Sequence, residues 1–110
     1  KEALGDLQEL KRRYLNVSVQ DKGVRYNTDL LEAIELGFLL DLAEVLVVSA
    51  LERKETRGGH AREDYPVRDD VNFMRHTMAY RTEGRDGETT VRLDYKPVVT
   101  TRYQPMERKY

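Results

Sequence analysis

Residues 27–55 read NTDLLEAIELGFLLDLAEVLVVSALERKE, and this stretch decides the fold. Its apolar side chains recur at steps of three and four, in a stripe made of Leu31, Ile34, Phe38, Leu42 and Val45 that further leucines and valines widen. That period predicts an α-helix over residues 28–55 whose width calls for neighbours on more than one side. The side chains of residues 27–29 are suited to cap its start, Arg53 and Lys54 are expected in its last turn, and Gly58-Gly59 is expected to stop it.

A shorter amphipathic helix is predicted upstream over residues 2–15, where Leu4, Leu7, Leu10 and Tyr14 share one stripe. Residues 16–26 are expected to be an extended connection, so the two helices form an antiparallel helical hairpin. At a rise of ~1.5 Å per residue the long helix spans about 40 Å and the short one only about 20 Å. We therefore expect a third helix of the bundle, upstream of Lys1 or in a partner, and a sequence cut from a longer chain.

The second half predicts a charged loop over residues 56–72 and then a β-hairpin with an extended tail over 73–110. Alternation places Met74, His76, Met78 and Tyr80 on one side of the first strand, and the return strand alternates Val91, Leu93 and Tyr95 with polar residues. We expect one apolar face and a turn through Gly84 and Asp86-Gly87. Pro97 and Pro105 lack amide donors, so residues 98–110 are expected to be an edge strand or tail. The fold class is thus mainly α, as one domain.

Composition limits what the chain can do. Its 110 residues allow a single core. The formal net charge of -1 gives no long-range attraction for nucleic acid, and the absence of cysteine excludes disulfides and thiolate metal sites. No apolar stretch approaches the ~18 to 20 residues that a membrane-spanning helix needs, so no membrane span is predicted.

Three blocks of the sequence carry a family resemblance. They are residues 27–36 (NTDLLEAIEL), 57–66 (RGGHAREDYP) and 68–77 (RDDVNFMRHT). In their order and spacing they resemble the C-terminal domain of succinate dehydrogenase and fumarate reductase flavoproteins. The family usually has Ser at Thr56 and often Ala at Gly59, which affects loop rigidity more than identity. The helical part and the Arg-Gly-x-His segment also resemble the C-terminal domain of L-aspartate oxidase, which is the alternative family.

The resemblance implies a parent oxidoreductase that interconverts succinate and fumarate by hydride transfer to FAD, in electron transport and the tricarboxylic acid cycle. This chain is expected to be a non-catalytic buttress that binds no FAD itself, since it lacks the Gly-x-Gly-x-x-Gly fingerprint. The implied partners are the FAD domain of the same chain, the iron–sulfur subunit and a flavinylation assembly factor. The implied location is cytoplasmic, at the inner face of the cytoplasmic membrane, or the mitochondrial matrix face.

The candidate site residues are Arg57, His60, Arg62, Asp64 and Arg68. They are interpreted as an ion-paired loop that docks on another domain, because arginine and carboxylate form planar bidentate pairs. The family resemblance implies that this docking supports flavinylation. No residue is assigned to catalysis, cofactor binding or a metal.

The charged residues are also compatible with other kinds of site. His60, Asp64 and His76 could form a metal-dependent hydrolase site, but their spacing matches no ligand pattern, and His76 is expected to be half-buried on the apolar strand face. Asp69 and Asp70 are typical of a solvated turn more than of a cation site. Four arginines interleaved with two aromatic residues resemble a nucleic-acid-binding patch: Arg57, Arg62, Arg68, Arg75, Tyr65 and Phe73. Nearby carboxylates neutralise the charge of these arginines. A free-standing protein-interaction module remains a further alternative.

Overall fold

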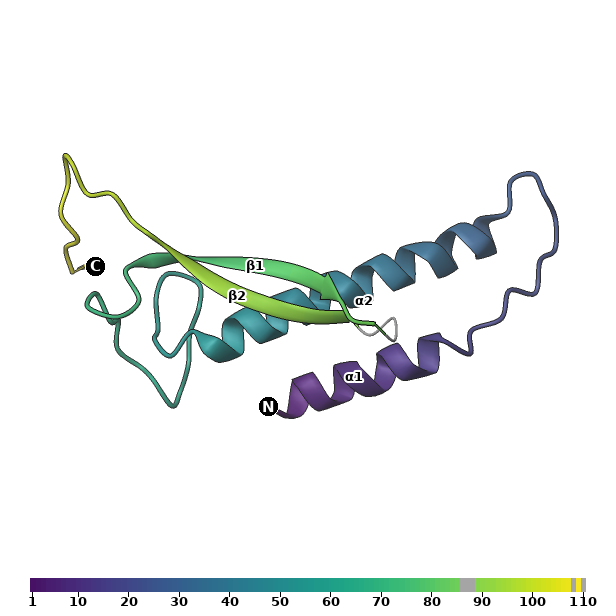
Figure 1. Cartoon of the computed structure of the whole chain (residues 1–110), viewed down its shortest axis with the longest axis horizontal. Helices are drawn as coiled ribbons and strands as arrows, with labels where there is room; N and C mark the ends of the chain where they lie inside the picture. Colours follow the sequence, from purple (N-terminus) through teal and green to yellow (C-terminus); the bar gives the residue numbers. More distant parts are fainter. Residues whose placement is uncertain (86–88, 108, 110) are drawn as a thin grey trace. The chain divides into compact units, whose positions relative to one another are not determined.

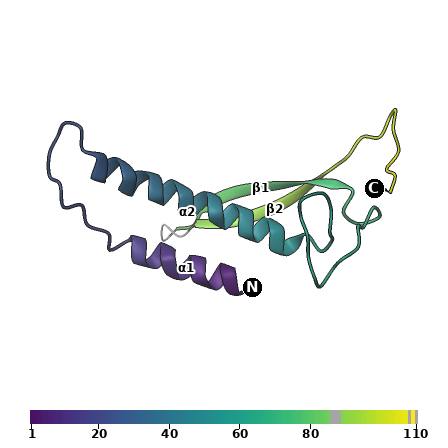
Figure 2. The ribbon, with the colours of Figure 1, turned by 180° about the vertical axis from the view of Figure 1, so that it is seen from behind.

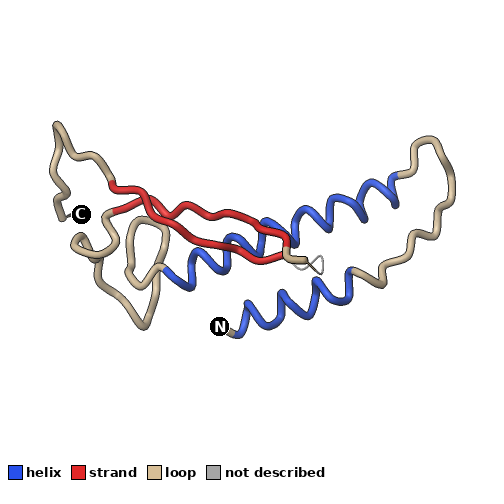
Figure 3. Tube along the Cα trace, viewed as in Figure 1, coloured by secondary structure: helices blue, strands red, loops and turns tan. Residues whose placement is uncertain are grey.

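A computed structural model describes residues 1–85, 89–107 and 109 of the chain. The chain divides into two compact units, Lys1–Leu51 and Glu52–Tyr110. The elements in order are α1 (Glu2–Tyr14), α2 (Thr28–Glu52), β1 (Arg75–Glu83) and β2 (Thr89–Pro97). Figure 3 distinguishes the helices from the strands and from the loops between them.

The first unit is an antiparallel pair of helices, as predicted. In both ribbon views α1 lies beside α2 (Figures 1 and 2), and their contacts run in opposite order along the two helices. The Tyr14 hydroxyl donates a 2.7 Å hydrogen bond to the carbonyl of Ala33. One turn earlier on α1, the Lys11 ammonium lies 3.3 Å from Asp41 and also pairs with Glu44, about two to three turns further along α2 than Ala33. The two polar contacts therefore set the register of the helices.

A glycine on α2 permits their close approach. A Cβ atom built on Gly37 would lie 2.6 Å from the Tyr14 hydroxyl oxygen and 2.9 Å from Cζ of the same ring. Glycine costs a helix interior about 0.8–1 kcal/mol relative to alanine. Its presence here is explained by the space that the Tyr14 ring occupies.

The predicted cap of α2 is confirmed, because Oδ1 of Asn27 accepts a 3.0 Å hydrogen bond from the amide of Leu30. The predicted end of the helix is wrong by three residues. Helix α2 ends at Glu52, so Arg53 lies beyond its last turn. The physical reason is that the Arg53 guanidinium is engaged elsewhere, with Glu55 and with the carbonyls of Phe73 and Arg75.

Helix α2 keeps much apolar surface exposed in this chain. Phe38, Leu42 and Leu46 are 63%, 67% and 70% exposed, whereas Leu7 of α1 is buried. The wide apolar surface agrees with the prediction of further neighbours. The described residues contain α1 and α2 but no third helix of a bundle. Neither of these two helices is both long and apolar enough to cross a membrane.

In the second unit, β1 and β2 form the predicted antiparallel hairpin, but its predicted faces are wrong for β1. Thr77 lies opposite Tyr95 and Ala79 opposite Leu93, so the apolar side chains of β2 share a face with Thr77 and Ala79. His76 lies opposite Lys96 on the other face and is exposed rather than half-buried. Alternation reveals two faces in each strand, whereas the pairing register decides which faces combine.

The hairpin is followed by a tail without helix or strand. Residues 98–107 form no regular element, which confirms the predicted tail. The carbonyl of Met106 accepts a 3.0 Å hydrogen bond from Nη1 of Arg68, so this part of the tail is tied to the charged loop. The predicted turn residues Asp86-Gly87 lie outside the described residues.

Candidate functional site

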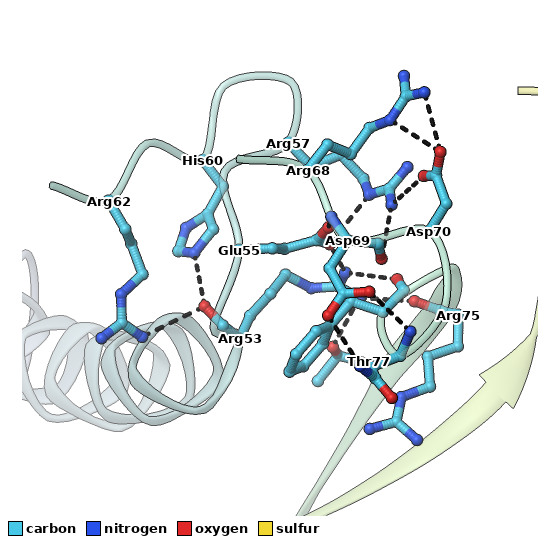
Figure 4. A network of polar contacts seen from close by, with 12 residues as sticks. Arg53, Glu55, Arg57, His60, Arg62, Arg68, Asp69, Asp70, Arg75 and Thr77 are labelled. Atoms are coloured by element: carbon cyan, nitrogen blue, oxygen red, sulfur yellow. Dashed lines mark hydrogen bonds and ion pairs between the residues drawn. The ribbon is translucent and has the colours of Figure 1, made fainter. Parts of the chain in front are cut away.

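A buried carboxylate organises the charged segment that follows α2. Glu55 has no exposed surface, and its two oxygens accept hydrogen bonds from Arg53, from Nε of Arg57 at 2.9 Å and from the amide of Asp69 at 2.9 Å. Figure 4 shows Glu55 between these groups. Burial raises the pKa of Glu55, but the bonds from Arg57, the Asp69 amide and Arg53 outweigh it, so its pKa is below the ordinary value. Glu55 is therefore held as an anion.

A second carboxylate extends the network outward. Asp70 accepts from Nη2 of Arg57 at 2.7 Å and from Nε of Arg68 at 3.1 Å, so one aspartate joins two arginines. The hydrogen bond from Arg57 is the main cause of a lowered Asp70 pKa. The bond from Arg57 to Glu55 is likewise the main cause of a raised Arg57 pKa. These charge-assisted bonds fix the side of the loop that carries Arg57 and Arg68.

Arg53 links the loop to the start of the hairpin. Its guanidinium donates to the carbonyl of Phe73 at 2.9 Å, to that of Arg75 at 2.6 Å and to Oγ1 of Thr77 at 3.1 Å. The planar fork of arginine is suited to several acceptors at once. Residues 53–57 are thereby fastened to residues 73–77.

His60 and Arg62 meet at one backbone carbonyl. Residues 57 and 60 close a turn by exchanging two backbone hydrogen bonds, and Gly58 in that turn has a φ of 58°, a conformation that favours glycine. The turn places Nε2 of His60 at 3.1 Å and Nη1 of Arg62 at 3.2 Å from the carbonyl oxygen of Arg53. A carbonyl only accepts, so Nε2 of His60 carries the proton in this contact.

Arg62 has a carboxylate partner of its own. Its Nε and Nη2 lie 2.8 and 2.5 Å from the two oxygens of Asp64, a bidentate pair, and its guanidinium stacks 4.9 Å from the centre of the Tyr65 ring. This pair lowers the Asp64 pKa and raises that of Arg62. The Thr56 hydroxyl accepts from the Arg62 amide at 2.9 Å and donates to the Tyr65 carbonyl at 2.7 Å, so threonine supplies the hydroxyl that serine would.

Asp69 closes the turn that leads into β1. Its Oδ1 accepts from the amides of Val71 and Asn72 at 3.0 and 2.9 Å, and its Oδ2 accepts from Nδ2 of Asn72 at 3.0 Å. The bonds from Asn72 are the main causes of its lowered pKa. The predicted turn role of Asp69 is confirmed, whereas Asp70 is an ion-pair partner rather than a solvated charge.

The five residues predicted from the sequence all belong to the segment, in two groups. Arg57 and Arg68 meet at Asp70, while His60 and Arg62 meet at the Arg53 carbonyl. Sequence reasoning missed the centre of the network, Glu55, and its neighbour Arg53. The available signal was the alternation Arg53-x-Glu55-x-Arg57, because residues two apart in an extended segment project to the same side.

Most charged side chains of the segment already have partners. The described residues hold no group of three or more His, Asp or Glu side chains that could hold a metal ion. His60 is used by a backbone carbonyl, and His76 is exposed on the opposite face of the hairpin from Thr77. The carboxylates near the arginines already accept hydrogen bonds from guanidinium groups or backbone amides. The segment can therefore present a rigid, charged surface to a neighbour.

A protein-family model matches the whole chain. Residues 1–110 match the family model described as the C-terminus of the fumarate reductase flavoprotein. The chain is 44% identical to a fumarate reductase flavoprotein subunit of Haemophilus influenzae over 108 residues, 98% of this chain and 17% of the relative. It is 47% identical to a succinate dehydrogenase flavoprotein subunit of Rickettsia conorii over 100 residues, 91% of this chain and 16% of the relative.

Solved structures agree with the sequence matches. The chain superposes on the FrdA chain of a mutated E. coli quinol fumarate reductase with a TM-score of 0.83 and 42% identity, covering 94% of this chain and 17% of that one. A quinol–fumarate reductase with menaquinol molecules matches with the same score and identity, covering 96% and 18%. The chain thus spans 16 to 18% of the length of these relatives.

Proposed function

Because the chain belongs to the C-terminal family of fumarate reductase flavoproteins, we propose that it is the C-terminal part of a succinate dehydrogenase or fumarate reductase flavoprotein. The parent interconverts succinate and fumarate by hydride transfer to FAD, and this segment contributes no catalytic group. The relatives are named fumarate reductase and succinate dehydrogenase subunits, which favours this proposal over an L-aspartate oxidase.

The segment acts as a buttress for the FAD domain. The observation that carries this proposal is the buried Glu55, which accepts hydrogen bonds from Arg53 and Arg57. Arg53 also donates a hydrogen bond to the carbonyl of Arg75, at the start of β1. Such a network costs conformational entropy and desolvation to assemble, and it specifies one geometry. A fixed geometry at a surface is what correct docking of another domain requires, and flavin incorporation in turn depends on the docked arrangement.

The apolar surface of α2 serves the same assembly. Phe38, Leu42 and Leu46 are more than half exposed, and burying such side chains stabilises by roughly 1.5–3 kcal/mol each. We assign their cover to a further helix of the parent chain, which completes a three-helix bundle with α1 and α2. A free-standing interaction module would leave this surface in water, where patches of this kind promote association.

The remaining partners follow from the family. The parent flavoprotein passes electrons to an iron–sulfur subunit, and a flavinylation assembly factor assists covalent attachment of its FAD. The complex lies at the inner face of the cytoplasmic membrane, or at the matrix face in mitochondria. FAD binding is assigned to the parent and not to this segment.

Replacing Arg62 with alanine in the full-length flavoprotein tests the buttress role. Arg62→Ala removes the bond to the Arg53 carbonyl and the bidentate pair with Asp64 without removing a reacting group. We expect covalent flavin, measured by fluorescence of the denatured subunit, to fall severalfold through reduced folding and abundance. Succinate oxidation per bound flavin should stay unchanged.

The matched control is Arg12→Ala, which removes an arginine from an exposed pair with Glu9. Exposed pairs of this type contribute about 0–1 kcal/mol, so flavin content should stay at the wild-type level. Normal flavin content in Arg62→Ala, or an equal loss in both variants, would contradict the proposal.

A further inference from the structure

Arg75, the first residue of β1, is the arginine of the network that lacks an acidic partner. Four other arginines each contact a carboxylate: Arg53 with Glu55, Arg57 with Glu55 and Asp70, Arg62 with Asp64, and Arg68 with Asp70. Within residues 1–85, 89–107 and 109, the Arg75 side chain makes no hydrogen bond or ion pair, and its Nε is buried without an acceptor. Counting Asp69, five guanidinium groups face four carboxylates in this set.

The Arg75 guanidinium is held in place despite having no anion. Its centre lies 3.7 Å from the centroid of the Tyr95 ring and 5.4 Å from that of the Phe73 ring. Its backbone is fixed at both ends, because its amide donates to the Phe73 carbonyl at 2.7 Å and its carbonyl accepts from Arg53 at 2.6 Å. In Figure 4 its guanidinium points away from Glu55 and Asp70.

The aromatic rings do not replace an anion. Cation–π contacts attract the guanidinium, but a ring face accepts no in-plane hydrogen bond from the guanidinium fork. A buried donor without an acceptor destabilises the fold, because the hydrogen bond to water that it loses is not replaced. The fold therefore positions a charged, planar donor group and leaves its Nε–H without an acceptor among the described residues.

We propose that Arg75 is a docking residue that receives one carboxylate, from an Asp or Glu in the part of the flavoprotein chain outside residues 1–110. A single uncompensated guanidinium matches a monovalent carboxylate, and its fork binds the two oxygens side by side. The chain spans only 16 to 18% of its relatives, so most acidic side chains of the parent lie outside it. This inference rests on the proposed function, because it requires a parent flavoprotein.

Zero-length cross-linking of the full-length flavoprotein carrying Arg75→Lys tests the inference. A carbodiimide joins a lysine to a carboxylate in direct contact by an amide bond, and the reagent takes up the water that is lost. We expect mass spectrometry of the digested protein to show a peptide that links position 75 to an Asp or Glu outside residues 1–110. No such product, or one that maps within residues 1–110, would overturn the inference.

The control is Arg92→Lys. Arg92 also stacks on a ring, that of Tyr80 at 4.6 Å, but it lies opposite Tyr80 on the hairpin face that His76 occupies. Because Arg92 projects from the other face, its lysine variant should not give the linked peptide that position 75 gives. The same cross-linked carboxylate in both variants would show that the reaction does not report the Arg75 contact.

Carboxylate labelling provides a second measurement that does not depend on the lysine variant. In Arg75→Gln, one Asp or Glu outside residues 1–110 should react severalfold faster with carbodiimide and an amine than it does in the wild type, whereas Arg92→Gln should leave it unchanged. An unaltered labelling pattern would overturn the inference. Wild-type protein without covalent flavin would instead contradict the proposed function, so the two failures are distinguishable.

Discussion

Glu55→Gln removes one negative charge from the centre of the network while keeping the shape of the side chain. Arg53 and Arg57 would lose their shared anion, and the Asp69 amide would lose a charged acceptor. Removing one partner of a buried pair costs about 3–5 kcal/mol. Arg53 and Arg57 remain 17% and 30% exposed, so water compensates them in part, and we expect the low end, about 3 kcal/mol.

Hydrogen exchange of the full-length flavoprotein is the suitable assay, because it reports local opening. A loss of about 3 kcal/mol corresponds to amide exchange faster by about a hundredfold. This faster exchange is expected at the amide of Asp69 and at the neighbouring amides in residues 55–75 that exchange by local opening. Glu63→Gln, an exposed carboxylate in the same loop, is the control and should leave the rates unchanged. Equal protection of residues 55–75 in Glu55→Gln and wild type would refute the central role of Glu55.

Two further predictions concern packing and pH. Gly37→Ala should lower the melting temperature of the full-length protein, because the new methyl group meets the Tyr14 ring and overpacking costs about 1–3 kcal/mol, more than the gain in helix propensity. Gly5→Ala, whose Cβ meets no atom within 4 Å, should instead leave stability unchanged or raise it by up to about 1 kcal/mol; the same sign for both would refute the packing argument. The pKa values of Glu55, Asp69 and Asp70 are lowered in the fold. The ionised carboxylates therefore contribute their full stabilisation at a pH above their unfolded-state pKa values, which lie near about 4, and this stabilisation is lost as the pH falls through their folded-state pKa values. Protection of residues 55–75, measured as opening free energy between pH 7 and pH 3, should thus be constant down to about pH 5 and decline below about pH 4, and a loss between pH 7 and 5 would contradict this.

The helices could be predicted because local chemistry determines them. The stripe from Leu31 to Val45 has the period of a helix, and Asn27 supplies the oxygen that the first free amides require. The end of α2 was harder to predict, because Arg53 and Lys54 suit a final helical turn equally well. The helix ends at Glu52 because Arg53 gains acceptors from residues 73–77, a contact that no local pattern contains.

The centre of the site could not be identified in the same way. Glu55 stands in the run Glu-Arg-Lys-Glu, which is also typical of a solvated helix end. What buries it is the return of the chain, which brings the amide of Asp69 within 2.9 Å across a separation of fourteen residues. Arg57, Arg62 and Arg68 were recognisable through the family resemblance, yet their individual partners follow from the turn at Gly58 and from the position of Asp70.

The hairpin shows why a period alone leaves a face undefined. Met78 and Tyr80 alternate correctly in β1, and Leu93 and Tyr95 alternate correctly in β2, but the register places the two sets on opposite faces. A change of register by one residue would have brought them together. The observed register instead places Arg75 diagonally across from Tyr95, within the reach of long and aromatic side chains, and so creates the stacked guanidinium.

The two units offer different kinds of surface to a neighbouring part of the parent chain. Under the proposed function the exposed leucines of α2 pack against an apolar partner, and their burial supplies free energy in proportion to area. The segment around Glu55 is nearly neutral once its pairs are made, and complementary charges at an interface fix orientation more than they add affinity. A polar substitution at Leu42 should therefore weaken attachment of the segment, whereas loss of Arg75 should leave it attached with its orientation less defined. Under the proposed function flavin incorporation depends on both, so hydrogen exchange at α2, which should rise only in the first case, separates the two effects.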